Sequence, residues 1–251
     1  MNIIRVDNNK IANSKINNDI NLKDNICIDI LNNTNLYIEI NDSNKVDVKI
    51  NIKKDKKLKL FNFSETSNSN IKFYITQEEN TELTFNSFYK NVNVEEETII
   101  DLNGMNSNVE YNYSCLGNTK KYLKINHNFS NTNSIVKSHA VSKNDVIQFE
   151  IIEYVPKKSI NCNLSQSSKI INLGDNKCLI KPILLIDEEE VKASHSSVIT
   201  PISSEDLLYL MSRGINKDNS IRLLVNGFLI NNLNLKEEEK HILYEKHVFR
   251  R

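Results

Sequence analysis

From about residue 26 to residue 193 the chain alternates apolar and polar side chains with a period of two. Val46, Val48 and Ile50, for example, are separated by single polar residues. Period two gives each extended segment one buried face and one solvated face. Strand starts recur every ten residues or so, with Asn, Asp, Ser and Lys between them. This spacing is typical of a β-sandwich or a β-solenoid, and periodicity alone does not choose between them.

The composition limits the class of partner. Lys and Arg number 32, as do Asp and Glu, so the formal net charge is zero and favours neither nucleic acid nor an anionic membrane as a partner. Glycine (5) and proline (3) are scarce among the 251 residues, whereas asparagine is abundant. Because asparagine tolerates the left-handed backbone region, we expect it to replace glycine at tight turns.

The sequence predicts a cytoplasmic protein. No segment approaches the roughly 20 apolar residues that span a bilayer. The first ten residues, MNIIRVDNNK, lack the apolar region of a secretory signal. The four cysteines have no paired spacing, which favours a reducing compartment over a disulfide framework.

The period becomes helical near residue 203. Ser203, followed by Asp206, predicts a helix start, and Arg213 followed by Gly214 predicts its end. Asn216 is expected to cap a second helix, and a third, charged helix is expected to start near Asn234. Apolar stripes on the first two helices have two interpretations: packing against the β region, or docking of a partner.

The helical region contains the run Leu207–Ile215 (LLYLMSRGI), followed by Arg222–Leu224 and Gly227–Leu229. With these residues it resembles the SufB/SufD family of iron–sulfur cluster assembly scaffolds. Upstream, Lys192–His195 is similar to the family's lysine–cysteine–serine–histidine element. Two of the family's strands are similar to the segments Gln166–Asp175 and Lys181–Pro182. The resemblance spans roughly 127–230, and residues 1–120 share only general strand character.

The resemblance implies a mainly β fold: a right-handed parallel β-helix (β-solenoid) at 1–200, with a C-terminal α-helical segment at 201–251. Helices capping the C-terminal side would dock the family's ABC-type ATPase, SufC, and ATP would act only through that partner. The second partner would be a SufB-like subunit or a second copy of the chain. The residues that the resemblance assigns to partner binding are Leu207, Tyr209, Leu210, Met211, Arg213, Gly214, Ile215, Arg222 and Phe228.

His195 is the candidate metal ligand. An imidazole ligates iron when neutral and titrates near physiological pH. The resemblance places this histidine at the interface between two scaffold subunits, where a transient iron–sulfur cluster forms. The alternative is a histidine that is hydrogen-bonded for structural reasons.

Several positions depart from the family pattern. Ala193 stands where the family has a cysteine, and Ser196 follows the histidine. The cysteine that SufB-type members place after the strand's Gln166 is replaced by Ser167 or Ser168. Because the SufB-type cysteine is absent, the chain is more similar to SufD than to SufB. Hydroxyls are poor iron ligands beside thiolates, so a partner would supply the thiolates.

Cys162 and Cys178 are weaker metal candidates. Each shares the inward phase of its strand, and their spacing of sixteen residues would allow the two to stack on neighbouring coils as a two-thiol site or a transfer path. The alternative is that they are small apolar core residues, as we expect for Cys27 and Cys115.

The remaining polar residues point to no catalytic chemistry. His127 and His139 have no second ligand at metal-binding spacing, so we interpret both as structural. His241 and His247 fall on the charged last helix, and the acidic run Asp187–Glu190 is typical of a solvated turn.

No nucleotide-binding loop, nucleophile elbow or zinc-protease motif occurs, so the sequence predicts that the chain is not an enzyme. The alternative function is a β-helix binding module for surfaces or glycans, without a cluster role. Export would favour that alternative, whereas a cytoplasmic location would exclude it.

Overall fold

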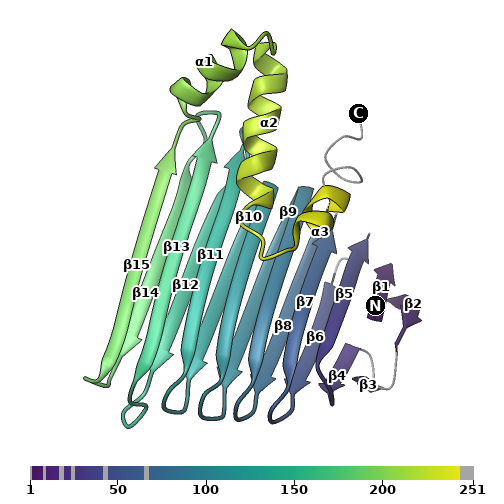
Figure 1. Ribbon diagram of the computed structural model, residues 1–251, viewed down its shortest axis with the longest axis vertical. Coiled ribbons are helices and arrows are strands. Elements are labelled where there is room, and N and C mark those ends of the chain that lie inside the picture. The colour runs from purple at the N-terminus through teal and green to yellow at the C-terminus, as the bar shows by residue number, and fades with distance from the viewer. Residues whose placement is uncertain are drawn as a thin grey trace.

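The computed structural model describes residues 2–7, 10–16, 20–23, 26–41, 45–64 and 68–243. They form a parallel β-solenoid of about seven turns, followed by helices (Figure 1). The predicted β-helix is therefore confirmed, and the sandwich alternative is wrong because strands of successive coils pair in parallel.

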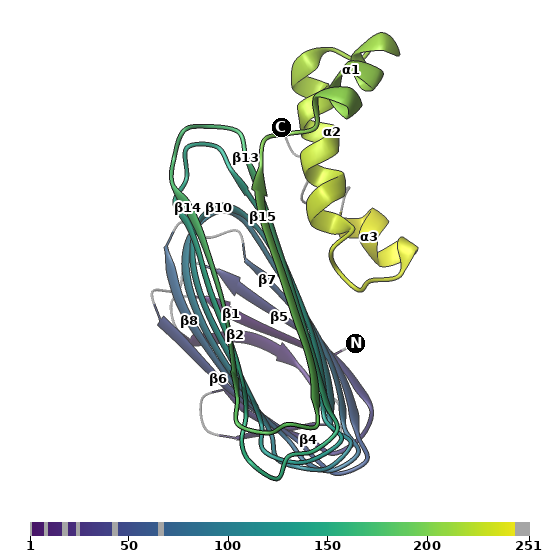
Figure 2. The same ribbon diagram turned by 90° about the vertical axis from the view of Figure 1, so that its left-hand side faces the viewer.

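Two layers of strands enclose the apolar interior (Figure 2). The first sheet contains β1 (Asn2–Asp7), β2 (Lys10–Lys15), β5 (Thr34–Asn41), β7 (Lys57–Ser64), β11 (Asn133–Ser142), β13 (Cys162–Asn172) and β15 (Val191–Thr200). The second sheet contains β3 (Ile20–Lys23), β4 (Ile26–Ile30), β6 (Lys45–Ile52), β8 (Ser69–Gln77), β12 (Ile147–Val155) and β14 (Cys178–Ile186). Two long strands, β9 (Glu82–Leu102) and β10 (Asn108–His127), run through both sheets.

The register explains the sequence spacing. Val46 pairs with Ile71, and Ile75 pairs with Ile100, so one coil takes about 25 residues and contains two strands. β10 passes from one sheet to the other at Gly117, whose φ of 128° favours glycine.

Asparagines make many of the turns, as predicted. Those with positive φ are Asn80, Asn106, Asn131, Asn144 and Asn161. Side-chain bonds between coils add to this arrangement, because the Nδ2 of Asn106 donates to the Oδ1 of Asn80 at 2.9 Å. Asparagine therefore replaces glycine at these corners.

Three helices follow the last strand: α1 (Ser204–Ser212), α2 (Lys217–Ile230) and α3 (Glu237–Leu243). Ser203 and Asn216 cap α1 and α2 as predicted, and Gly214 has a φ of 86° between them. The third helix begins three residues after the expected Asn234.

The helices do not cap the solenoid, so that prediction is wrong. They lie against the outer face of the first sheet, with α2 crossing β10 and β11 (Figures 1 and 2). The first sheet carries apolar residues on its outer face, including Phe63, Phe88 and Val141, and these pack against Val225 and Leu229 of α2. A sheet that is apolar on both faces requires a cover, and the helices provide it.

The C-terminal end of the solenoid is thereby left uncovered. Within the described part of the chain, β15 pairs only with β13 and β14 pairs only with β12. We call the surface formed by β14 and β15 the open end. At the other end, antiparallel strands β2 and β3 lie beside β1 and β4.

Candidate functional site

His195 lies in the middle of β15, at the open end. It is in register with Gln166 of β13, so it belongs to the inward-facing row of that sheet. Because no described strand covers β15, the side chain of His195 is exposed. Gln166, which occupies the same position one coil earlier, is buried. The imidazole is thus presented to whatever covers the open end.

The positions that depart from the family's thiols surround this histidine. Ala193 is in register with Leu164 on the same inward row, and Ser196 points away from it. In β13, Ser168 is buried and faces inward, whereas Ser167 faces outward. β15 and the coil below it therefore offer an imidazole and hydroxyls around His195, whereas the cysteine of the open end, Cys178, begins β14 in the other sheet.

The structure separates Cys162 from Cys178. Cys162 begins β13 in the first sheet, where its Sγ lies 3.2 Å from the carbonyl oxygen of Ser159. Cys178 begins β14 in the second sheet, beside Ile147. The two strands run in opposite directions, so their starts lie at opposite edges of the solenoid (Figure 1). The expected stacking is not found, and among the described residues no three His, Cys, Asp or Glu side chains gather as metal ligands.

Of the other two cysteines, Cys115 is fully buried, as predicted for a core residue. Cys27 is only half-buried and has the outward phase of β4, so its assignment to the core is wrong.

Apolar side chains accompany the unpaired edges of the open end. They are between 37 and 53 % exposed: Leu179, Leu185, Ile186, Val198 and Ile199. An uncovered strand edge with exposed apolar residues is a template for association with another chain. The open end therefore has the character of an interface.

The first helix projects from the molecule. α1 has no buried residue, and Leu208, Tyr209 and Met211 are 65, 59 and 40 % exposed. The guanidinium of Arg213 lies 5.3 Å from the centre of the Tyr209 ring. Of the residues that the sequence assigns to partner binding, Tyr209 and Arg213 lie side by side, whereas Met211, two residues from Tyr209, is exposed on another side of the helix. Leu207, Leu210 and Ile215 are only half-buried, and Arg222 lies exposed on α2.

Phe228, another residue assigned to partner binding, instead faces the solenoid. Its ring stacks on His139 of β11 with centroids 4.2 Å apart, and the Nδ1 of His139 donates to its carbonyl oxygen at 3.0 Å. Nearby, the Oγ of Ser114 donates to the carbonyl oxygen of Leu229 at 2.8 Å. α2 is therefore anchored, while α1 is free of the solenoid.

The interior contains ionisable residues that the sequence analysis did not single out. Lys121 of β10 is buried, its Nζ donates to the Oγ of Ser138 at 3.0 Å, and it lies 4.1 Å from the ring centre of Tyr111. Burial lowers the pKa of Lys121 to about 7, although the carboxyl of Glu96 raises it in part. The hydroxyls of Tyr89 and Tyr111 both donate to Glu96.

A second set surrounds Glu153 of β12 and His127 of β10, both fully buried. His127 is hydrogen-bonded, in agreement with its interpretation as a structural residue. The sequence carries a signal for Glu96, Lys121 and Glu153, because each occupies the inward phase of an alternating strand. Lys121, for example, precedes Leu123 and Ile125 at intervals of two. Charged residues in that phase are costly unless they are paired, so they mark sites that packing alone does not explain.

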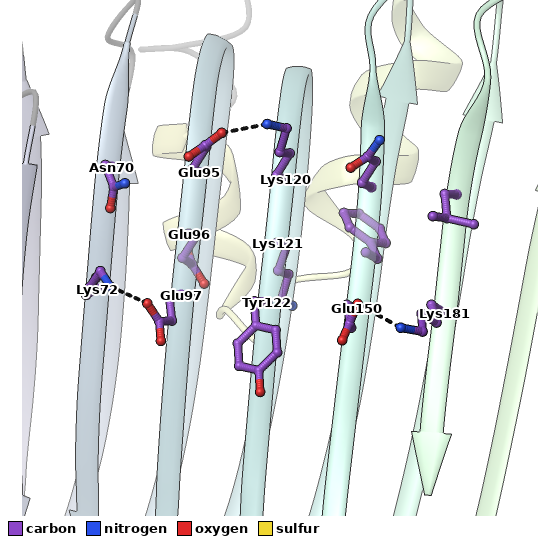
Figure 3. A pocket seen from close by; sticks show the side chains of 13 residues that line it. Asn70, Lys72, Glu95, Glu96, Glu97, Lys120, Lys121, Tyr122, Glu150 and Lys181 are labelled. Carbon is purple, nitrogen blue, oxygen red and sulfur yellow. Dashed lines mark hydrogen bonds and ion pairs between the residues drawn. The ribbon is translucent and has the colours of Figure 1, made fainter.

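An open hollow of about 420 Å³ lies on the outer face of the second sheet (Figure 3). Tyr122 lies at its centre, flanked by Glu97 and Glu150 on the neighbouring strands. The carboxylates accept from Lys72 and Lys181 at 2.5 and 3.1 Å, and these pairs are drawn in Figure 3. Because its charges are already matched, the hollow shows no preference for a charged ligand.

Comparison with known proteins decides the family. The sequence model for the family described as "SUF system FeS cluster assembly, SufBD core domain" matches residues 16–228. The chain belongs to the SufB/SufD family. The match extends over most of the residues before 120, where the motifs had shown only strand character.

The relatives include a protein named SufD and proteins named only as SufBD family members. The iron–sulfur cluster assembly protein SufD of Bacillus subtilis (strain 168) is 32 % identical over 113 residues, which cover 43 % of this chain and 26 % of that protein. A SufBD family protein of Staphylococcus aureus (strain USA300) is 29 % identical over 109 residues, or 42 % of this chain and 23 % of that protein. The chain thus matches about a quarter of these relatives' length. None of its described helices is long and apolar enough to cross a membrane.

Proposed function

We propose that this SufB/SufD family member is a SufD-like, non-catalytic scaffold subunit of a SUF-type complex that assembles iron–sulfur clusters. The observation that carries the proposal is the combination of the exposed α1 with an uncovered open end that presents His195. The β-helix at 1–200 is the scaffold, and residues 201–251 are the docking segment. The complex works in the cytoplasm.

The ABC-type ATPase SufC docks on α1 in this proposal. The exposed side chains of Leu208, Tyr209 and Met211 offer apolar area around α1, Arg213 lies beside Tyr209, and Arg222 is exposed on α2. Aromatic and arginine side chains contribute much of the energy of such interfaces. ATP is bound by the partner. When two ATPase subunits close on each other, they pull on the two scaffold subunits bound to them. This pull shifts the interface between the scaffold subunits from one of its two states to the other.

The open end joins a SufB-like subunit or a second copy of the chain. Main-chain pairing along β14 and β15 supplies hydrogen bonds, and the exposed apolar residues supply buried area. His195 then lies inside the interface as a ligand or proton acceptor for the nascent cluster. The partner provides the thiolates, because β15 itself carries no cysteine.

The proposal is tested by anaerobic co-purification of the tagged chain from its own host, with partner identification and iron analysis. Recovery of an ABC-type ATPase together with a SufB-like protein supports the SufD-like role. Recovery of the ATPase alone indicates a homodimeric scaffold. Recovery of neither overturns the proposal and favours a binding module without a cluster role.

Two variants separate the two surfaces. Tyr209→Glu is expected to abolish ATPase recovery without affecting the scaffold partner, and Val198→Lys is expected to do the reverse. Phe129→Glu is the matched control, because Phe129 is 46 % exposed but lies on the turn between β10 and β11. Equal loss in all three variants would mean that neither surface is specific.

A further inference from the structure

Glu153 and Gln166 form a buried polar pair inside the solenoid, below the open end. Glu153 is fully buried and shares the inward phase of β12 with Ile151 and Val155. Gln166 is 2 % exposed on β13 of the facing sheet, and its register partner on β15 is His195. The pair therefore lies within the last coils of the solenoid, and His195 lies next to it at the open end.

Neither side chain has a hydrogen-bond partner. Both carboxyl oxygens of Glu153 and both polar atoms of Gln166 are unsatisfied. Leaving a buried polar group without a partner is unfavourable. His127 shows the contrast, because its two ring nitrogens lie 2.8 and 3.1 Å from the hydroxyls of Thr132 and Ser134. Packing alone therefore does not explain the Glu153–Gln166 pair.

The carboxyl of Glu153 can ionise near neutral pH. Burial raises the pKa of Glu153 to about 7, and the nearby Ser134 and Gln166 lower it in part. Their contacts do not meet hydrogen-bond geometry, so the carboxyl oxygens remain open to another partner. A bound cation would stabilise the carboxylate form directly.

The donor set defines the ligand. Two carboxyl oxygens and an amide oxygen, with the Ser134 hydroxyl nearby, suit hard or borderline divalent cations. Because affinity follows the number of charged ligands, one carboxylate predicts a weak site, with a dissociation constant of about 10⁻⁵ to 10⁻³ M. Such a site exchanges its ion readily, as a transfer site requires.

We propose that Glu153 and Gln166 bind one divalent cation of the Mn²⁺ and Fe²⁺ class inside the solenoid, and that the register of Gln166 with His195 gives this ion a path to the open end. The assignment of Fe²⁺ as the natural ion rests on the proposed function. The existence of the site does not, because Mn²⁺ alone tests it.

The experiment is a titration of the purified full chain with Mn²⁺, in which free Mn²⁺ is followed by electron paramagnetic resonance. We expect one ion per chain, with binding at least tenfold weaker in Glu153→Gln and in Gln166→Met. Glu150→Gln is the matched control, because Glu150 lies on the outer face of the same strand and pairs with Lys181. Absence of binding at millimolar Mn²⁺, or equal binding by Glu153→Gln, overturns the proposal.

Thermal unfolding gives a second readout that a merely structural role would not produce. Without metal, Glu153→Gln is expected to melt no lower than the unsubstituted chain, because it removes a desolvated carboxyl. Mn²⁺ is expected to raise the melting temperature of the unsubstituted chain but not that of the variant. If the Mn²⁺ experiments find no cation site, the co-purification result still stands. The cation site and the proposed scaffold function can therefore be refuted separately.

Discussion

The imidazole of His139 lies face to face with the ring of Phe228, with centroids 4.2 Å apart and an interplanar angle of 6°. This contact joins β11 to α2, because Nδ1 also donates to the carbonyl oxygen of Phe228 at 3.0 Å. A residue expected to serve a partner thus holds α2 on the solenoid. In the proposed complex, the anchoring of α2 matters because a pull on α1 would reach the solenoid only through such attachments.

Replacing His139 with alanine is expected to loosen α2. The change removes the stacked ring and the hydrogen bond, together worth about 1–3 kcal/mol. We expect faster hydrogen exchange in α2 and a lower urea midpoint. Lys137→Ala is the matched control, since Lys137 is two residues away and makes an exposed ion pair with Glu110 at 3.2 Å. That pair is worth less than about 1 kcal/mol, so equal effects would contradict this role for His139.

Acid should weaken the same contact. Burial lowers the pKa of His139, and Lys169 and Lys137 lower it further, against the raising effect of the Phe228 carbonyl. The unfolded chain, with a histidine pKa of about 6.5, therefore binds the proton more readily. Stability is lost as pH falls below that value. Urea midpoints between pH 7 and 5 should fall less steeply in His139→Ala.

Lys121 should make stability rise with pH above neutrality. In the folded chain its pKa is about 7, because burial disfavours the charged amine. In the unfolded chain the pKa is about 10.4, so between these values the unfolded chain binds more protons. The free energy of unfolding then rises by up to about 1.4 kcal/mol per pH unit.

Lys121→Met is expected to remove that rise while filling the same space. The measurement is urea unfolding at pH 7, 8 and 9. Lys120→Met serves as the control, because Lys120 is exposed and pairs with Glu95 at 2.8 Å. If Lys121→Met kept the full slope, the amine would not be neutral in the folded chain.

Period-two alternation was sufficient to predict the strands, and helix caps at Ser203 and Asn216 were predictable from their residue types. The position of the helices was not predictable, because it depends on the outward Phe63 and Phe88 meeting α2 from far along the chain. The choice of solenoid over sandwich also needed long-range pairing. The family resemblance supplied it, since periodicity carries no information about the register between coils.

The candidate site divides in the same way. His195 lies exposed at the open end and its role there stays a prediction, whereas Cys162 and Cys178 lie apart because consecutive strands of one coil begin at opposite edges. In the sequence, Glu153 looks like one more polar residue in a long strand. The phase of its neighbours shows that it faces inward, and only the structure shows that it lacks a hydrogen-bond partner.

Two glycines should respond oppositely to alanine. A Cβ at Gly104 would collide with the backbone of Glu78 and Glu79 on the preceding coil, and backbone cannot move aside without breaking the stacked turns. Gly104→Ala is therefore expected to cost about 1–3 kcal/mol. Gly227 lies within α2 and has open space around the added Cβ. Gly227→Ala is expected to stabilise by about 0.5–1 kcal/mol, since alanine favours helix. Urea unfolding measures both changes. A neutral Gly104→Ala would show that adjacent coils are less closely stacked at this turn, whereas a destabilising Gly227→Ala would show that a neighbour occupies that side of α2.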